Sequence, residues 1–163
     1  MELKTYLADT FRYNDYANKR VLEKIRELPD PAEGVRLFSH LINSMNKWMG
    51  RVESWPGYVD LDWSLPVYEI DGLTPKWDEC LERWLTFLNA RSDEELEQEV
   101  EFIGFDGTMF AAAIKDIALQ LNYHSIHHRA QVQTIIRSQG LEPEFLDYIA
   151  TKYRRVEETT SLI

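Results

Sequence analysis

The sequence predicts an all-α fold, a four-helix bundle, from three observations. Apolar residues recur at three- and four-residue steps through four long segments, which is the spacing of one helix face. Helix-stopping residues such as Pro29, Pro56 and Gly140 fall at the ends of these segments. The chain has 163 residues with 44% hydrophobic content, which is enough for one compact core. We therefore expect a single helical domain over residues 1–155, followed by a polar tail over 156–163.

The first two helices are predicted over about residues 3–28 and 33–55. The first ends before Pro29 and Pro31, and the second stops at Pro56-Gly57. The connection that follows, about 56–73, is unusually long for a helical bundle. We expect this connection to cross over the bundle between the second and third helices and to shape the rim of a pocket.

The third helix is expected to run from the cap signal Thr74-Pro75 to about residue 91. Asp106-Gly107 is flanked by apolar residues and is typical of a tight turn, so it predicts a small β-hairpin before the next helix. The fourth long helix is expected over about residues 110–138.

The segment after the fourth helix carries a stop signal and then a start signal. Gly140 is expected to end the helix in the left-handed conformation, with Leu141 folding back onto the last turn. A short C-terminal helix is expected from Pro143 to about residue 153. The apolar residues expected to pack against the bundle there are Phe145, Leu146 and Ile149.

Composition argues against several classes of protein. The net charge is -10 and no basic patch is evident, which argues against nucleic-acid binding. The first residues lack the pattern of a signal peptide, and no stretch approaches the roughly 18 apolar residues of a membrane span. We therefore expect a cytoplasmic protein without membrane association. Cys80 is the single cysteine, and its acidic neighbours favour a packed small residue over a catalytic thiolate.

Two histidines one helical turn apart, His124 and His128, lie on the apolar face of the predicted fourth helix. Burying an unpaired imidazole costs about 1–3 kcal/mol, so each ring needs a hydrogen-bond partner or a metal. Side chains four residues apart have Cβ atoms about 5–6 Å apart, so this pair could chelate an ion. The pair lacks the glutamate of the His-Glu-x-x-His motif, and a histidine on an apolar face is more often a hydrogen-bonded core residue than a metal ligand.

A third ligand would have to come from another helix. His40 lies at the edge of the apolar face of the second helix, where periodicity permits an inward side chain without requiring one. His127 is one residue off the apolar face of its helix and is free to face another helix or solvent.

Four pieces of the chain carry recognisable motifs. In order, they are Tyr13-Asn-Asp-Tyr-Ala-Asn18; Ser39-His40-Leu-Ile with Trp48; Asn122-x-His124-x-x-His127-His128-Arg-x-Gln131; and Arg137-x-x-Gly140 with Pro143 and Asp147. Together these pieces resemble the DinB/YfiT-like family of metalloenzymes, and the resemblance covers nearly the whole length. The chain departs from the family at three points: Ala130 stands where the family has glycine, Tyr16 stands where it has tryptophan, and one extra residue separates Asn122 from His124.

The resemblance implies that His40, His124 and His128 bind one divalent transition metal, nickel or zinc by analogy with the family. Three imidazoles leave coordination positions open, as a catalytic site requires. Because ligating histidines usually donate their second ring N–H to a fixed acceptor, polar neighbours are expected to support the rings. The candidates for this support are Asn14, Asn122, Arg129 and Gln131, with an interhelical ion pair as the alternative for Arg129. Trp48, Trp55 and Tyr123 are candidates for a pocket beside the metal, or else for the core.

Characterised relatives imply a thiol-dependent S-transferase, which would act on a small-molecule substrate with a low-molecular-weight thiol. Hydrolysis by metal-activated water is the close alternative, and a non-enzymatic, stress-related metal- or ligand-binding bundle is the competing class. Asp15, Glu53 and Asp116 are available bases, but spacing selects none of them, so no catalytic residue is predicted. The family also implies a homodimer.

Overall fold

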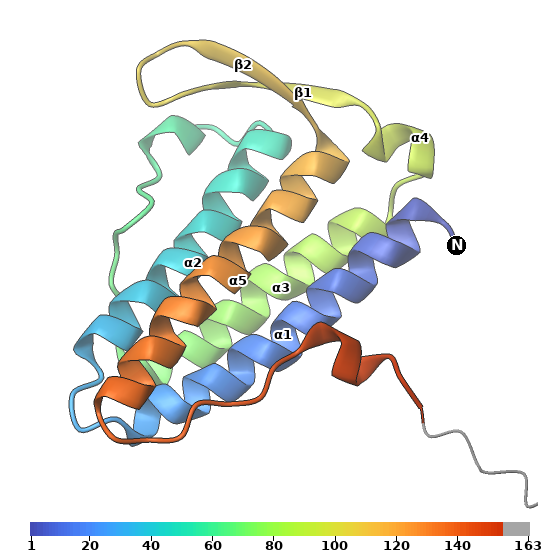
Figure 1. The fold of residues 1–163 in the computed structure, drawn as a ribbon. Coiled ribbons are helices and arrows are strands. Elements are labelled where there is room, and N and C mark those ends of the chain that lie inside the picture. Colours follow the sequence, from blue (N-terminus) through green and yellow to red (C-terminus); the bar gives the residue numbers. More distant parts are fainter. Residues whose placement is uncertain (155–163) are drawn as a thin grey trace, which may run out of the picture.

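A computed structural model describes residues 1–154, and the predicted polar tail lies outside this range. Four long helices form a bundle, with a two-stranded sheet across one end (Figure 1). The all-α bundle with a small hairpin is therefore confirmed. Among residues 1–154, no helix is long and apolar enough to cross a membrane. The elements are α1 (Leu3–Glu27), α2 (Ala32–Val52), α3 (Leu73–Asn89), α4 (Asp93–Leu96), β1 (Glu99–Ile103), β2 (Met109–Ala113) and α5 (Ile114–Ser138), with short 3₁₀ turns at Tyr58–Asp60, Ile70–Gly72 and Tyr148–Thr151.

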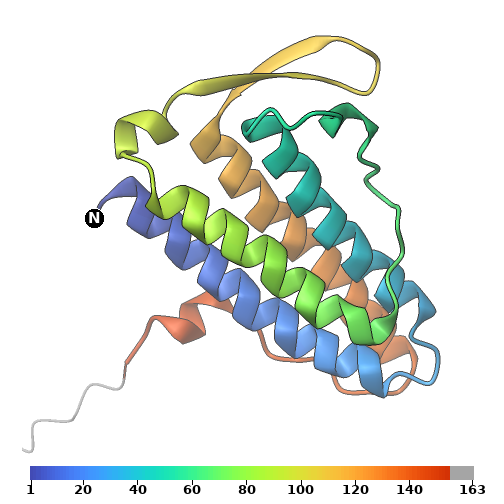
Figure 2. The same cartoon turned by 180° about the vertical axis from the view of Figure 1, so that it is seen from behind.

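The four long helices pack in the cyclic order α1, α3, α2, α5, so that α5 lies between α1 and α2. The connection between α2 and α3 returns the chain to the end of the bundle where α2 began, as Figures 1 and 2 show. Helices α2 and α3 therefore run in the same direction. This is the crossover that the length of the connection predicted, and it places a loop over the outer side of α2.

Large aromatic side chains fill part of the otherwise mainly aliphatic core. Trp77 and Trp84 of α3 are fully buried, as are Phe11 of α1 and Phe38 of α2. The Trp84 ring stacks on Phe11 with 5.6 Å between centroids, and its Nε1 donates to the carbonyl oxygen of Met45 at 3.0 Å. Each indole thus fills volume and satisfies its own donor, as a buried tryptophan must.

The hairpin includes residues that were predicted to belong to the fourth helix. Strand β2 pairs antiparallel with β1, with Phe110 opposite Phe102, so α5 begins at Ile114 instead of residue 110. The turn signal is confirmed, because Gly107 has a φ of 83° and the Asp106 carboxylate accepts from the Thr108 amide. Two strands alone are marginally stable. Burial of Phe102 against Trp48 anchors this pair to α2.

The C-terminal segment differs from the prediction of a helix over 143–153. Only Tyr148–Thr151 is helical, as a 3₁₀ turn, and the chain before it runs along α1 (Figure 1). Side chains from the bundle satisfy its backbone: Gln133 bonds both the N–H and the carbonyl of Glu144, and Tyr13 donates to the carbonyl of Leu146. A helix is therefore not needed to pair these groups.

Packing of this segment is also only partly as predicted. Leu146 packs against the core, but Phe145 and Ile149 are 69% and 61% exposed, so their predicted packing was wrong. The predicted helix stop is confirmed. Gly140 has a φ of 86°, and the Leu141 N–H reaches the Ile136 carbonyl at 3.1 Å while its side chain packs on the core.

Candidate metal centre

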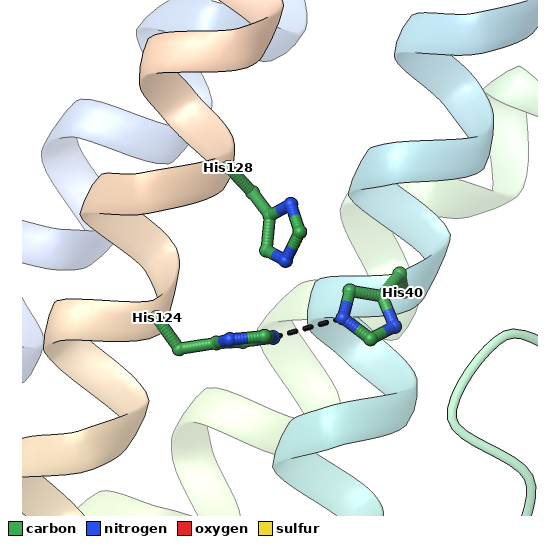
Figure 3. Close-up of side chains that lie close together, drawn as sticks. All are labelled: His40, His124 and His128. Carbon is green, nitrogen blue, oxygen red and sulfur yellow. Dashed lines mark hydrogen bonds between the residues drawn. The ribbon is translucent and has the colours of Figure 1, made fainter.

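The three predicted ligand histidines come together between α2 and α5. His40 projects from α2 toward His124 and His128, which stand one turn apart on α5 (Figure 3). The Nε2 atoms of His40 and His124 are 2.9 Å apart, and one ring nitrogen from each of the three residues lies within 4.8 Å of the others. All three residues are partly buried. Two nitrogen ligands of a tetrahedral ion lie about 3.3 Å apart, so the three ring nitrogens are close enough that they could hold one ion.

Two of the rings are oriented by acceptors on their far side. His40 Nδ1 is 2.6 Å from the carbonyl oxygen of Trp63, and His128 Nδ1 is 2.7 Å from Oε1 of Gln131. A carbonyl oxygen can only accept, so each Nδ1 carries the proton. Each Nε2 is then left with its lone pair directed into the cluster. This is the arrangement that ligating histidines usually show.

The surroundings of His124 and His128 disfavour the protonated form of both rings. The pKa of His124 is lowered to about 4, chiefly by burial and then by repulsion between imidazolium charges on His124 and on its neighbours His128 and His40. Burial also lowers the pKa of His128, against the opposing effect of its bond to Gln131. Metal binding requires unprotonated imidazole. Near neutral pH, therefore, His124 is unprotonated and has no proton to lose before it could bind an ion.

The lowered pKa of His124 predicts a pH dependence of the metal-free protein. The neutral form is favoured by folding, so the stabilisation is fully present above the unfolded pKa of about 6.5 and is lost as pH falls through about 4. We expect up to about 3 kcal/mol of unfolding free energy to be lost over this range because of His124.

Urea unfolding at pH 7 and pH 4, with chelator present, measures this effect. His124→Gln should lose less stability between the two pH values than wild type, whereas the exposed His127→Ala should lose as much as wild type. Equal losses in His124→Gln and wild type would contradict the assignment.

Of the four residues predicted to support the rings, Gln131 alone bonds a histidine of the cluster. Arg129 donates instead to the side-chain oxygens of Asn14 and of Asn18, and Asn122 donates to Thr10. These partners, and Asn14 itself, lie on α1, so Asn122 and Arg129 face α1 whereas His124 and His128 face α2. The predicted support by Asn14, Asn122 and Arg129 is not found, and the ion pair proposed as an alternative for Arg129 is not found either among residues 1–154.

The three aromatic residues predicted to line one pocket beside the metal lie apart. Tyr123 lines a cavity between α1 and α5 that includes none of the three histidines. Trp55 packs under the guanidinium of Arg83 and donates from Nε1 to Glu53. Trp48 contacts Phe102 and Trp63, and it approaches the site only through Trp63. A shared pocket was therefore the wrong interpretation.

Two residues near the three histidines were not predicted from the sequence. Trp63 supplies its backbone carbonyl, which any residue type could have done, so the sequence held no signal for it. Ser44 places its Oγ 3.3 Å from Nε2 of His124. Its position four residues after His40 on the same face of α2 was a usable signal.

The candidate metal ligands are all histidine nitrogens. Among residues 1–154, no carboxylate or cysteine joins the three histidines. Cys80 is buried in the core and its pKa is raised to about 12, so it is a packed residue as predicted. Three neutral imidazoles leave the full charge of a divalent ion uncompensated. The residues present therefore suit one transition-metal ion with open positions.

Fold and site together define a helical bundle with a three-histidine group that could hold a metal ion. The sequence profile of the DinB superfamily matches residues 35–132, a range that contains all three histidines. The chain belongs to the DinB superfamily. No curated protein and no solved structure matches the chain significantly.

The hydrogen bond between His128 and Gln131 predicts an effect of Gln131 on metal affinity. Replacing Gln131 by leucine removes the acceptor that fixes the His128 ring, and losses of such supports typically cost about 10–100-fold in metal affinity. We expect a weakening of that order in a competition titration with a chromophoric chelator. Gln131→Glu, which keeps an acceptor at this position, should bind much more tightly than Gln131→Leu. Equal affinities for wild type and Gln131→Leu would show that the bond does not orient the ring.

Proposed function

We propose that His40, His124 and His128 bind one divalent transition-metal ion, nickel or zinc, and that the protein uses it to activate a small thiol for transfer to an electrophilic substrate. The observation that carries this proposal is the convergence of three imidazoles, two of which have Nδ1 hydrogen-bonded to the carbonyl oxygens of Trp63 and Gln131. A divalent ion bound there would lower the pKa of a coordinating thiol and so supply a thiolate near neutral pH.

The residues of 1–154 that surround the three histidines orient the rings and place no carboxylate beside them. The Trp63 carbonyl and the Gln131 amide hold two rings in the ligating orientation. Ser44, within 3.3 Å of His124 Nε2, offers a hydroxyl at the inner side of the site. The absence of a carboxylate from the cluster in residues 1–154 leaves the site positive when an ion is bound, which favours an anionic sulfur nucleophile.

The reaction class is a substitution or an addition at carbon. The thiolate sulfur forms a bond to the electrophilic carbon. In a substitution, a leaving group such as chloride departs with the bonding electron pair. In an addition, the π electrons of the double bond move to the neighbouring carbon, which takes up a proton from solvent. The thiol proton passes to solvent, so the step needs no oxidant or reductant.

A conjugation assay tests the proposal. An aryl chloride is incubated with a panel of small thiols and the nickel- or zinc-loaded protein, and product formation is followed by absorbance. We expect thiol-dependent turnover in wild type and in His127→Ala, and at least about a hundredfold less in His124→Ala.

Three other outcomes would each overturn the proposal. Turnover that is equal in His124→Ala and wild type would separate the activity from the histidines. Ester hydrolysis without thiol would identify a hydrolase. Metal binding with no turnover across the panel would leave a metal-binding bundle without catalysis.

A further inference from the structure

The cavity between α1 and α5 that Tyr123 lines is separate from the three histidines. Its volume is about 190 Å³, and it is lined mainly by apolar and aromatic groups. Four tyrosines surround it, and the 3₁₀ turn at Tyr148–Thr151 closes one side. Tyr123 and Ile126 are 62% and 49% exposed, so the cavity opens to solvent at their side. The tyrosines are Tyr6, Tyr13, Tyr123 and Tyr148.

A buried cation forms part of the lining. Arg129 is 5% exposed, and its Nη1 donates to the Oδ1 atoms of Asn14 and Asn18 and to the Oγ of Ser125. All of these partners are neutral. Among residues 1–154, no acidic side chain lies within 4.0 Å of this guanidinium, although eleven other ion pairs are present. A buried charge without a counter-ion is costly, by several kcal/mol in typical cases.

Two residues that line the same cavity each have a buried polar atom with no hydrogen-bond partner within residues 1–154. Asn14 is 2% exposed, and its Nδ2 makes no hydrogen bond. Asn122 is 7% exposed, and its Oδ1 accepts none. Buried polar groups are nearly always paired, so unpaired ones on a cavity-lining residue point to a missing partner. Arg129 and Asn14 supply a positive charge and a donor, whereas Asn122 supplies an acceptor suited to a ligand hydroxyl or a water.

We propose that this cavity binds a small aromatic carboxylate, with the carboxylate directed to Arg129 and Asn14. The guanidinium matches a carboxylate in geometry and charge. The size is suitable, because a dry cavity of about 150 Å³ is known to hold a benzene ring. The tyrosine rings supply faces and edges against which an aromatic body packs.

The cavity lining favours a carboxylate over a phosphate. A phosphate has three strongly hydrated acceptor oxygens and needs several donors. Here the cavity wall is mostly apolar, and the hydroxyl of Tyr13 already donates to the Leu146 carbonyl. A single carboxylate on an apolar ring is therefore the better match than phosphate.

Isothermal titration of the full-length protein with benzoate, phenylacetate and salicylate tests the proposal. A strong chelator is present throughout, so that coordination to a metal cannot account for the heat. Benzamide serves as the neutral control, since it has the shape of benzoate without the charge. We expect at least one carboxylate to bind, and benzamide to bind about tenfold or more weakly than benzoate.

Three variants locate the binding. Arg129→Met removes the charge at similar length, and it should reduce carboxylate affinity about tenfold or more. Ile126→Trp fills the exposed edge of the cavity without touching the Arg129 network, so it should block binding even if Arg129→Met fails to fold. Arg137→Met, on the exposed last turn of the same helix, is the matched control and should bind as wild type does.

Absence of binding by all three carboxylates would overturn the proposal. So would equal affinity for benzamide and benzoate, or binding that is unchanged by Ile126→Trp. Because the readout is binding in the metal-free protein, failure here is independent of the outcome at the histidine cluster.

Discussion

Adding nickel or zinc to the metal-free protein is expected to raise its free energy of unfolding by about 4 kcal/mol when free metal is 1,000 times the dissociation constant. The reason is that His40, His124 and His128 converge only in the folded chain, since two of them stand on α5 and one on α2. Binding free energy at such a site is folding free energy. Urea unfolding with and without metal, monitored by tryptophan fluorescence, measures the difference.

The matched variants separate this site from nonspecific metal binding. His124→Ala should unfold at the same urea concentration with and without metal, whereas His127→Ala should keep the full stabilisation. His127 is exposed and lies outside the three-histidine group, although it adjoins His128 in sequence. An equal loss of the metal effect in both variants would contradict the assignment of the ligands.

Replacing Trp84 by alanine is expected to destabilise the protein by about 3–5 kcal/mol. The side chain is fully buried between α1 and α2, where it stacks on Phe11 and lies edge-on to Phe87. The substitution creates a large cavity and also removes the donor to the Met45 carbonyl. A loss of this size is a large part of the usual stability of a domain.

Equilibrium unfolding measures the loss in Trp84→Ala, with circular dichroism as the probe because the substitution removes a fluorophore. Phe145→Ala is the control, since that ring is 69% exposed and its removal should change the stability by less than about 0.5 kcal/mol. A loss below about 1.5 kcal/mol in Trp84→Ala would mean that the core does not depend on this ring.

The helices were largely predictable because local signals and tertiary packing agree. Pro29 ends α1 within one residue of the expected position, and Gly140 adopts the left-handed conformation that its place predicts. Where pairing with another segment determines the secondary structure, the sequence was less informative. Phe110 suits a helix face as well as a strand, and its pairing with Phe102 settles the matter in favour of the strand.

The histidine cluster and its surroundings were predictable to different degrees. On α5, His124, His128 and Gln131 share one face, while Asn122, Ser125 and Arg129 share another. Strict use of this spacing would have assigned Arg129 and Asn122 to a different neighbour from the histidines. The Trp63 carbonyl was beyond such reasoning, because the course of a long connection depends on tertiary contacts that no local pattern encodes.

The most direct test of the central claim is elemental analysis of protein purified without an affinity tag or chelator. Wild type and His127→Ala should each hold about one equivalent of a transition metal, and His40→Ala and His128→Ala should hold almost none. Wild-type protein that contains no metal and cannot be loaded with nickel or zinc would contradict the claim. In that case the three histidines would be hydrogen-bonded residues of the α2–α5 interface, and the proposed metal-dependent activity would be excluded.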